Sequence, residues 1–396
     1  MSIMINGTEV TSVAVNGTNV TEVRVQKQGS STYTVVFKNA LASIYGVDKV
    51  GSSNPNALER TDDAVGLSYN RGTNEITSGF DRCYPWSDIK EETDSHGNVF
   101  IKIPKFYFKI TKNSDGTYKH QISGTKYPGF STLFVDGEGN ELNYVLVGKY
   151  EGSYNSASAC IMSKSGQTVK VSTTRSDYRT ACMKVGKGYQ QYDFLIDAII
   201  KELFLIEFAT TNSQSIMYGY ANGNTATITT GRTDSVKTPS GSQISNMDGK
   251  HACKYRGIEN LWGNTWTWVD GINFNNREIY VCEDPTEYAD EKYSAPYSFM
   301  TYRATSNDYL KTVTPFAKNP LLGYATAVGA SVTTYYSDYY WGDSAGTTLM
   351  YGGGWNNGET AGLWNWAGDN ITSYTNVNVG GRLCYKPPFK PAPSPV

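Results

Sequence analysis

The sequence predicts an α+β protein in which an antiparallel β component dominates. Of its 396 residues, 39 are glycine and 13% are aromatic, while only 18% are charged. This mixture is typical of turn-rich β proteins and differs from that of a helical bundle. Short alternating segments bounded by turn residues recur along the chain, and a single long helical pattern interrupts them. The length allows one large domain or two to three ordinary ones.

An internal repeat opens the chain. The segment INGTEVTSV at residues 5–13 recurs as VNGTNVTEV at residues 15–23. Asn-Gly is the strongest signal for a two-residue hairpin loop, because both positions must accept a positive φ. We therefore expect an N-terminal β segment over residues 1–33, too small to fold alone, with a linker at its end (QKQGSSTY, residues 26–33). The alternative interpretation of each NGT as an N-glycosylation site would need a secretory signal, which the first residues do not resemble.

Short strands and turns are expected from there to about residue 150. Residues 34–97 are predicted to form a β-rich region, and the segments at 98–110 and 143–155 alternate as strands do. The segment DGEGNE at residues 136–141 weakly resembles a calcium-binding loop, but Glu141 stands where the sharp turn of such a loop needs glycine. A plain turn is the better interpretation. No cofactor is predicted, and no motif supports a structural calcium ion.

One long helix is predicted over residues 192–214. Its apolar residues fall into two neighbouring rows at helical spacing, so apolar side chains cover most of its circumference. Such a helix is expected to be buried on most sides and to serve as scaffold. The rows consist of Leu195, Ile199, Leu203 and Ile206, and of Ile196, Ile200, Phe204 and Phe208. Strands and loops return beyond residue 219, and the Pro-rich tail at residues 387–396 cannot join a sheet.

Several classes of function lack support in the sequence. The net charge of −2 provides no basic footprint for nucleic acid, and no run of about eighteen apolar residues predicts a membrane span. Motifs of nucleotide-binding loops, serine hydrolases and zinc proteases are absent, and the three histidines are isolated. A metal centre assembled from distant histidines stays open, although isolated histidines in polar loops are more often surface residues. The six cysteines are scattered without a CxxC pair, so we expect them to be reduced and mostly buried, with one or two disulfides as the alternative.

The segment at residues 335–374 has an unusual composition. Ten of its forty residues are aromatic, about double the average of the chain, and no Lys or Arg occurs between Lys318 and Arg382. Tyr and Trp offer large contact area at low entropic cost, and Asn, Ser and Gly offer adaptable hydrogen bonds, as in antibody paratopes. Aromatic rings and amides together also suit a glycan. The absence of basic residues argues against a phosphate or nucleic-acid ligand.

Five aromatic residues crowd into the seven positions 335–341. Alternate side chains of a strand leave opposite faces, so these five cannot all point inward. We expect some of them to be exposed and to mark an interface. The alternative is an ordinary β core, which we accept for Trp355 and Leu363, because each lies beside a glycine that permits close packing.

Three motifs resemble the signature of formylglycine-generating-enzyme-like domains, in the order in which that family has them. GIENLWGNTWTWVDG at residues 257–271 is similar to the family's G-L-x-D-M-x-G-N-V-W-E-W motif. GGGW at residues 352–355 is similar to its R-G-G-S-W strand, and VGGRLCY at residues 379–385 to its closing strand. The resemblance implies a C-type-lectin-like fold over residues 98–386.

The residues of the first motif are expected to be structural, with Trp262, Trp266 and Trp268 as packing and Asn264 as a polar brace. Enzymes of that family use cysteines near the C-terminal end or clustered metal-binding histidines. This chain has Cys384 with no second cysteine nearby. We therefore predict a protein that is not an enzyme, with a formylglycine-generating oxidase as the alternative.

The segment from about residue 333 to residue 380 resembles the variable segment of proteins diversified by retroelements, whose type members are phage tropism determinants. In that family a lectin-like fold ends in a segment whose Asn codons scatter to Tyr, Ser, Asp, Thr and Gly. The resemblance implies a phage or prophage tail protein, made in the host cytoplasm without a signal peptide, that binds a host-surface protein or glycan. It also implies a homotrimer, attachment of the N-terminal segment to other tail proteins, no nucleic acid and no membrane insertion.

Ligand-binding side chains are therefore predicted in this variable segment. An invariant structural tail-tip protein and a variable protein displayed on a bacterial surface stay open as alternatives. The predicted ligand-binding residues are Tyr336, Asp338, Tyr340, Trp341, Asp343, Asn356, Asn357, Glu359, Thr360, Trp364, Asn365, Trp366, Asp369, Asn370 and Tyr374.

Overall fold

The computed structural model of the protein describes residues 40–244 and 247–387 and, before residue 40, the backbone of six strands. In the N-terminal segment β1 (Met4–Ile5) pairs with β2 (Thr8–Glu9), and β3 (Val13–Val15) pairs with β4 (Thr18–Val20). The inner partners of each pair are separated by two residues, which confirms the two predicted hairpins. The Asn-Gly residues, the linker residues 27–32 and tail residues 388–396 lie outside the described residues.

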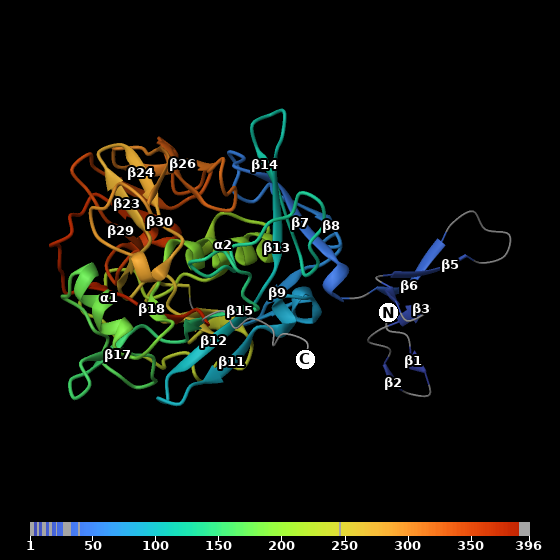
Figure 1. The fold of residues 1–396 in the computed structure, drawn as a ribbon, viewed down its shortest axis with the longest axis horizontal. Helices are drawn as coiled ribbons and strands as arrows, with labels where there is room; N and C mark the ends of the chain where they lie inside the picture. The colour runs from blue at the N-terminus through green and yellow to red at the C-terminus, as the bar shows by residue number, and fades with distance from the viewer. Residues whose placement is uncertain are drawn as a thin grey trace.

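The body of the chain, as described from residue 40 onward, is mostly antiparallel β with few helices, which confirms the predicted fold class in outline. Figure 1 shows helix α2 near its centre, with β12, β15 and β18 on one side and β23, β24 and β26 on the other. The helices are α1 (Arg175–Met183), α2 (Phe194–Phe208) and α3 (Ser213–Ile216), with the 3-10 turns η1 (Ala40–Ala42), η2 (Gly79–Arg82), η3 (Trp86–Asp88), η4 (Pro285–Glu287) and η5 (Gly358–Thr360).

The strands of the body form several sheets, and the larger ones join distant parts of the chain. One four-stranded sheet has the order β13-β14-β7-β8, and two five-stranded sheets have the orders β21-β20-β19-β10-β9 and β11-β12-β15-β32-β18. Their bounds are β7 (Ile44–Val50), β8 (Glu59–Asp62), β9 (Tyr69–Arg71), β10 (Glu75–Ser78), β11 (Lys90–Thr93), β12 (Val99–Pro104), β13 (Tyr107–Lys112), β14 (Tyr118–Ser123), β15 (Tyr144–Gly148), β18 (Tyr189–Gln191), β19 (Ser240–Ser242), β20 (Cys253–Tyr255), β21 (Ile258–Glu259) and β32 (Leu383–Tyr385).

The predicted boundaries at residues 33 and 97 do not coincide with breaks between sheets. Strand β6 (Tyr33–Lys38) starts at the first boundary and pairs with β5 (Glu22–Gln26). The second boundary falls inside the hairpin of β11 and β12, and β7 pairs with β14 from beyond it. Residues 40–97 therefore share sheets with the rest of the body, because their strands need partners from later in the chain.

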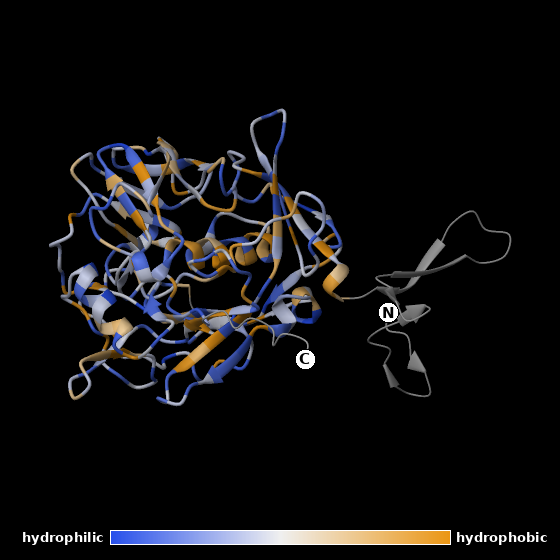
Figure 2. Ribbon diagram, viewed as in Figure 1, coloured by the Kyte–Doolittle hydropathy of each residue, from blue (hydrophilic) through white to orange (hydrophobic). Residues whose placement is uncertain are grey.

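Helix α2 has no face toward water: all fifteen of its residues are buried. The prediction of a buried scaffold helix is confirmed, and the ribbon in Figure 2 shows α2 coloured as mostly hydrophobic at the centre of the body. Asp193 caps its start by accepting a hydrogen bond from Ile196 N. The predicted end at residue 214 is wrong, because Ala209 takes a left-handed conformation with φ of 51° and stops the helix, and α3 is a separate turn.

A seven-stranded sheet covers α2 with one face and carries the C-terminal segment. Its order is β27-β26-β28-β30-β29-β22-β31, with parallel pairing between β28 and β30 and between β22 and β31. Its bounds are β22 (Trp266–Val269), β26 (Asp308–Pro315), β27 (Gly323–Val328), β28 (Tyr339–Gly342), β29 (Leu349–Gly352), β30 (Gly362–Gly368) and β31 (Val379–Gly380). Three further strands, β23 (Ile272–Asn275), β24 (Glu278–Val281) and β25 (Ser298–Tyr302), form a smaller sheet, and β16 (Ser153–Asn155) pairs with β17 (Cys160–Met162).

The register of this sheet separates an inner from an outer face. Tyr340, Trp366, Tyr351 and Thr267 lie side by side in one row, and the three aromatic members belong to the core that includes α2. The neighbouring row consists of Trp341, Ala367, Met350 and Trp268, which pack in a second cluster together with Trp266. Because side chains alternate along a strand, the second row lies on the outer face.

The weak calcium-loop candidate is a turn, as predicted. Val135 and Glu141 pair across it, and Asp136 Oδ1 accepts hydrogen bonds from Glu138 N and Asn140 N. The Glu141 carboxylate binds Lys105, Lys126 and Tyr107. Across residues 40–244 and 247–387, no group of three His, Cys, Asp or Glu side chains could hold a metal ion. None of the helices described there is long and apolar enough to cross a membrane.

A buried polar network joins the first family-like motif to the last. Glu151 accepts hydrogen bonds from Asn260 Nδ2 at 3.0 Å and from Asn264 Nδ2 and Thr265 Oγ1 at 2.5 Å each. Burial raises the pKa of Glu151, and the nearby Arg382 guanidinium acts in the opposite direction. Asn264 also accepts a hydrogen bond from Ile228 N, which confirms its role as a polar brace, and Trp266 is buried as predicted.

Arg382 is fully buried and donates to four backbone carbonyls. Nη1 binds the carbonyls of Gly148 and Lys149, and Nη2 binds those of Glu259 and Asn260. These carbonyls belong to the last residues of β15 and β21 and to the residue after each strand, so a single side chain from the C-terminal region fixes the ends of two distant strands. The sequence motif around Arg382 therefore has a structural cause.

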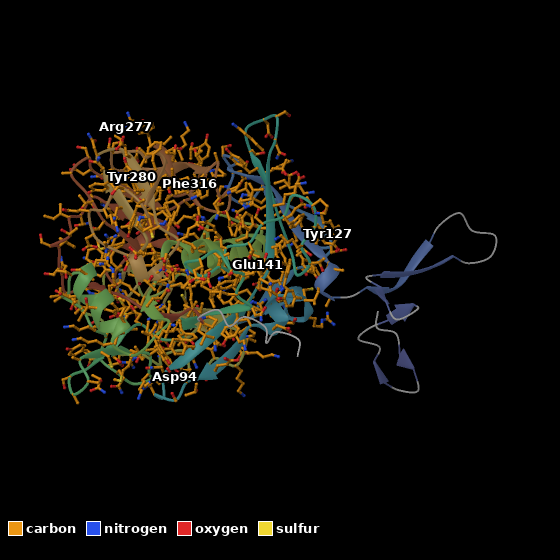
Figure 3. The ribbon with its side chains drawn as sticks, in the orientation of Figure 1. Asp94, Tyr127, Glu141, Arg277, Tyr280 and Phe316 are labelled. Carbon is orange, nitrogen blue, oxygen red and sulfur yellow. The ribbon has the colours of Figure 1, made fainter. Side chains whose placement is uncertain are left out.

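We expect Arg382→Met to lower the free energy of unfolding by about 3 to 5 kcal/mol, because four buried carbonyls lose their donors and Glu151 loses its nearby positive charge. Urea denaturation followed by tryptophan fluorescence measures the change. Arg277→Met is the matched control, since Arg277 is exposed at the outer edge of the body (Figure 3) and should change the value by less than about 0.5 kcal/mol. Equal effects of the two substitutions would contradict the role assigned to the network.

Candidate functional site

A row of aromatic side chains lies on the outer face of the seven-stranded sheet. Tyr309 of β26 is opposite Tyr339 of β28, and their ring centroids are 5.2 Å apart at nearly right angles. Tyr339 contacts Trp341 at 4.6 Å, and Trp341 meets Trp266 edge-on at 5.3 Å. Tyr309, Tyr339 and Trp341 are half-buried, so part of each residue stays accessible to solvent. We call Tyr309, Tyr339 and Trp341 the outer aromatic row.

Asn365 fixes the position of this row through hydrogen bonds. It lies on β30 with its side chain fully buried, and its Nδ2 donates to the backbone carbonyls of Tyr339 and Thr360. The amide thus ties the outer aromatic row to the turn η5. Asn365 is among the predicted ligand-binding residues, but its side chain is fully buried in this structure.

A polar pocket of about 250 Å³ opens beside the start of β28 and β30. Asp338 and Ser337 lie at its buried end, with exposed fractions of 1% and 3%. Trp364 N donates to Asp338 Oδ2 at 2.8 Å, and the Ser337 hydroxyl is buried without a hydrogen-bond partner. Residues 212–218, Met247, Val332 and Glu359 contribute the remaining wall. We define the polar pocket by Asn212, Gln214, Ser215, Tyr218, Met247, Val332, Ser337, Asp338 and Glu359.

The backbone that forms the pocket is held in an unusual conformation. Tyr335 and Ser337 have φ values of 57° and 60°, a left-handed region that non-glycine residues rarely occupy. Hydrogen bonds fix it: Tyr335 N donates to Ser53 O, and Ser337 N donates to Thr334 O. A Cβ at Gly362 would lie 2.1 Å from Asp338 Oδ1, so only glycine allows this close approach. The carboxyl of Asp338 is therefore placed by surrounding structure on both sides.

The electrostatics of the pocket are dominated by two carboxyl groups. Burial raises the pKa of Asp338 well above its usual range, and the Trp364 N–H and the more distant Lys201 only partly offset this effect. Glu359 is exposed at the rim. Burial and then the Glu359 charge raise the pKa of both Tyr218 and Tyr309, so Glu359 lies close enough to affect both phenols. Glu359 thereby links the polar pocket to the outer aromatic row.

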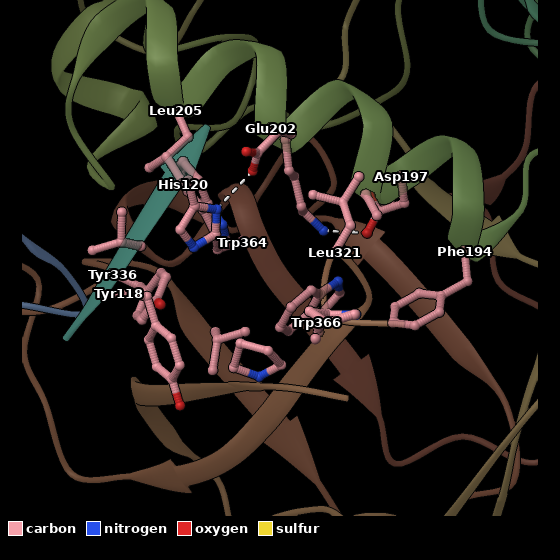
Figure 4. A pocket seen from close by; sticks show the side chains of 17 residues that line it. Tyr118, His120, Phe194, Asp197, Glu202, Leu205, Leu321, Tyr336, Trp364 and Trp366 are labelled. Atoms are coloured by element: carbon pink, nitrogen blue, oxygen red, sulfur yellow. Dashed lines mark hydrogen bonds and ion pairs between the residues drawn. The ribbon is translucent and has the colours of Figure 1, made fainter. Parts of the chain in front are cut away.

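Beneath the sheet, α2 and β30 enclose a small cavity of about 60 Å³ (Figure 4). Lys201 pairs with Asp197 on α2, and its ammonium lies 4.1 Å from the centre of the Trp366 ring. His120 Nδ1 lies 2.8 Å from Glu202 Oε2. These side chains line the cavity, and the Lys201 ammonium stabilises the Trp366 ring from the inner side of the sheet.

Six of the fifteen predicted ligand-binding residues are buried, so the prediction of a surface role for them is wrong apart from Asp338, which lines the polar pocket. Tyr340 and Trp366 are buried because the alternation of side chains along their strands turns them toward α2. Tyr336 packs against Trp364, with ring centroids 6.0 Å apart. The six are Tyr336, Asp338, Tyr340, Trp364, Asn365 and Trp366.

The other nine predicted residues are exposed or half-buried, but they do not form one patch. Asn356, Asn357, Glu359 and Thr360 lie in the connection from β29 to β30, at the end of the sheet where the polar pocket opens. Asp343, Asp369 and Asn370 follow the opposite ends of β28 and β30, where Arg303 binds the carbonyls of Gly368 and Asp343. Trp341 lies between the two ends, and Tyr374 packs edge-on against Trp268 at 6.4 Å.

Sequence reasoning missed several residues of the site. Tyr339 lies on the same face as Trp341 because alternate residues of a strand share a face, whereas Tyr340 lies on the opposite face. Tyr309, Tyr218 and Asn212 come from distant segments, and no local pattern around them signals their position. Ser337 carries no signal either, because its importance depends on burial.

The cysteines provide no reactive thiol at this site. All six are free, and five are buried. Burial raises the pKa of the Cys182, Cys253, Cys282 and Cys384 thiols, which disfavours the nucleophilic thiolate. Their reduced, mostly buried state agrees with the sequence-based prediction.

We expect Asp338→Asn to make the stability of the protein less dependent on pH. A carboxyl group whose pKa is raised by folding contributes its full stability below the pKa of the unfolded chain, near ~3.9, and loses it as the pH rises through the folded pKa. The free energy of unfolding of the unchanged protein should therefore fall more steeply from about pH 4 upward than that of the variant. Urea denaturation across this range tests the difference, with the exposed Asp88→Asn as control; parallel profiles for the Asp338 variant and the unchanged chain would contradict it.

No protein-family model matches the chain, and no curated protein matches it. Among solved structures, the chain is similar to three variants of a major tropism determinant. The U1 variant has a TM-score of 0.31 at 12% sequence identity, and the I1 variant 0.33 at 12%; each alignment covers 95% of this chain and 78% of the other. The M1 variant has a TM-score of 0.31 at 11% identity, over the same shares of the two chains.

Proposed function

We propose that this chain is a receptor-binding protein of a phage or prophage tail, which recognises a host-surface protein or glycan without covalent chemistry. The observation that carries the proposal is the outer aromatic row beside the polar pocket. Three half-buried rings lie on the outer face of the sheet, and a pocket with buried polar groups opens at one end of the same sheet. Such a combination provides contact area and directional hydrogen bonds together.

The division of the C-terminal segment supports the proposal. Tyr340, Trp364 and Trp366 belong to the core, whereas Asn356 and Glu359 are exposed on a connection held by backbone hydrogen bonds. A segment of this kind can change its exposed residues while its buried residues preserve the sheet. This property is what a diversified binding surface requires.

The remaining parts of the proposal concern assembly. We place the protein in the virion tail, with a C-type-lectin-like organisation of residues 98–386 and with the N-terminal hairpins attached to other tail proteins. A homotrimer would present several copies of the site at once, and such multivalency strengthens weak single contacts. The buried thiols with raised pKa values give no support to the alternative of a cysteine-dependent oxidase.

We expect Tyr339→Ala to weaken binding to host cells by about 30-fold or more, because it removes the central ring of the outer aromatic row. The neighbouring Tyr340→Ala is the matched comparison: it removes a buried ring whose hydroxyl donates to Ala304 O at 2.8 Å, and should cost about 3 to 5 kcal/mol of stability. Cell-binding assays with the purified protein and urea denaturation measure the two effects. If Tyr339→Ala left cell binding unchanged while the protein stayed folded, the outer aromatic row would not be the recognition surface.

Sequencing of this gene across its source population should reveal where the segment varies. We expect the codons of exposed residues such as Asn356, Glu359 and Thr360 to vary, and those of Tyr340 and Trp366 to stay fixed, because only the latter support the core. A nearby template copy with adenines at the variable positions would identify the mechanism. An invariant segment would contradict diversification and leave a tail protein with one fixed ligand.

A further inference from the structure

The carboxyl group of Asp338 is buried without a contacting positive charge. Oδ2 accepts one hydrogen bond, from Trp364 N, and the structure gives Oδ1 no partner. Lys201 of α2, the one cation among the described residues that acts on the pKa of Asp338, is already paired with Asp197. An ionised carboxylate in such a place is costly unless something supplies charge and hydrogen-bond donors.

The lining around this carboxyl holds a second carboxylate and further groups that can accept a hydrogen bond. The neighbouring Ser337 hydroxyl is buried and unpartnered, and Glu359 adds a second carboxylate at the rim. The Gln214 amide nitrogen already donates to the carbonyls of Gly358 and Ala361, which leaves its oxygen free to accept. The residues that line the pocket include no Lys, Arg or His. An anionic ligand would therefore meet repulsion here.

We infer that the polar pocket binds a primary ammonium group, held by Asp338, Ser337 and Glu359. An ammonium has three donors, which match these three acceptors, and its charge compensates the two carboxylates. Tyr218 also lines the pocket, and an aromatic ring there can favour a cation.

The volume of the pocket limits what carries this group. About 250 Å³ is below the ~300 Å³ at which sites for drug-sized molecules begin, and it suits one side chain or one sugar ring. A lysine side chain of a host protein and an amino sugar of a host glycan share the required chemistry. This inference depends on the proposed receptor-binding function only for the source of the amine.

Isothermal titration of the full chain with four small probes tests the inference. The ammonium probes are Nα-acetyl-lysine methylamide and glucosamine, and the neutral counterparts are Nα-acetyl-norleucine methylamide and N-acetylglucosamine. We expect at least one ammonium probe to bind tenfold or more tightly than its neutral counterpart. Binding of the lysine derivative would identify a host protein as the source of the amine, and binding of glucosamine would identify a host glycan. Equal affinity within both pairs would overturn the inference.

The binding should also depend on ionisation of Asp338, because the ammonium ligand requires the charged carboxylate. Burial raises the pKa of Asp338, so binding should release a proton, and affinity should rise as the pH increases toward that pKa. Titration in buffers of different ionisation enthalpy measures the proton. The other charged or titratable groups near Asp338 are Lys201, Glu359, Tyr218 and Tyr309.

Asp338→Asn should abolish binding of the ammonium probe, whereas the exposed Asp88→Asn should leave it unchanged. If the Asp338 variant does not fold, Glu359→Gln at the rim should weaken binding several-fold, and unchanged affinity there would overturn the inference. If the pocket binds the ammonium probe but the Tyr339→Ala variant still adsorbs to host cells, the ammonium site stands and the proposed recognition surface fails. If Tyr339→Ala abolishes adsorption but the unchanged chain does not bind the ammonium probe, the recognition surface stands and the ammonium site fails.

Discussion

Helix α2 must be covered on every side, and the sheets around it are arranged to meet this requirement. Its charged residues are buried together with its apolar ones, so each needs a partner from another element or from the helix itself. Lys201 pairs with Asp197, Glu202 with His120, and Glu207 with Arg256. Removing one partner of such a pair leaves an uncompensated charge in the interior. The position of the surrounding strands is therefore specified by polar contacts as well as by apolar packing.

The outer surface inherits its geometry from this core. Tyr340 and Trp366 face α2, so Tyr339, Trp341 and Asn365 must face away. The C-terminal segment is rich in aromatic residues because its strands place aromatic side chains on both faces of one sheet. Left-handed backbone at Tyr335 and Ser337 then directs Asp338 toward the polar pocket. Adjacent residues of the same strands therefore pack against the core and form the proposed recognition surface.

Local patterns in the sequence predicted the parts of the fold that local interactions decide. The Asn-Gly loops predicted the N-terminal hairpins, and two apolar rows predicted a helix buried on all sides. Trp266 and Asn264 were predicted as structural residues from their motif, and both are buried. The end of α2 was not predictable in this way, because Ala209 favours helix and only its left-handed backbone ends it. The candidate site depended still more on long-range contacts, since Tyr218 and Asp338 meet from segments more than a hundred residues apart. Tyr340 is a core residue and Tyr339 a surface residue because of their different burial, and the composition of the segment could not distinguish them.

The alternation of side chains along β28 and β30 also limits how this surface can evolve. A substitution at Tyr339 or Trp341 alters one outward side chain and leaves its neighbours in place. An inserted or deleted residue within either strand would instead rotate every later side chain to the opposite face, bringing core residues into solvent and polar residues against α2. Variation in this segment is consequently restricted to exchanges that keep its length constant. Changes in length are confined to the connections, such as the one between β29 and β30.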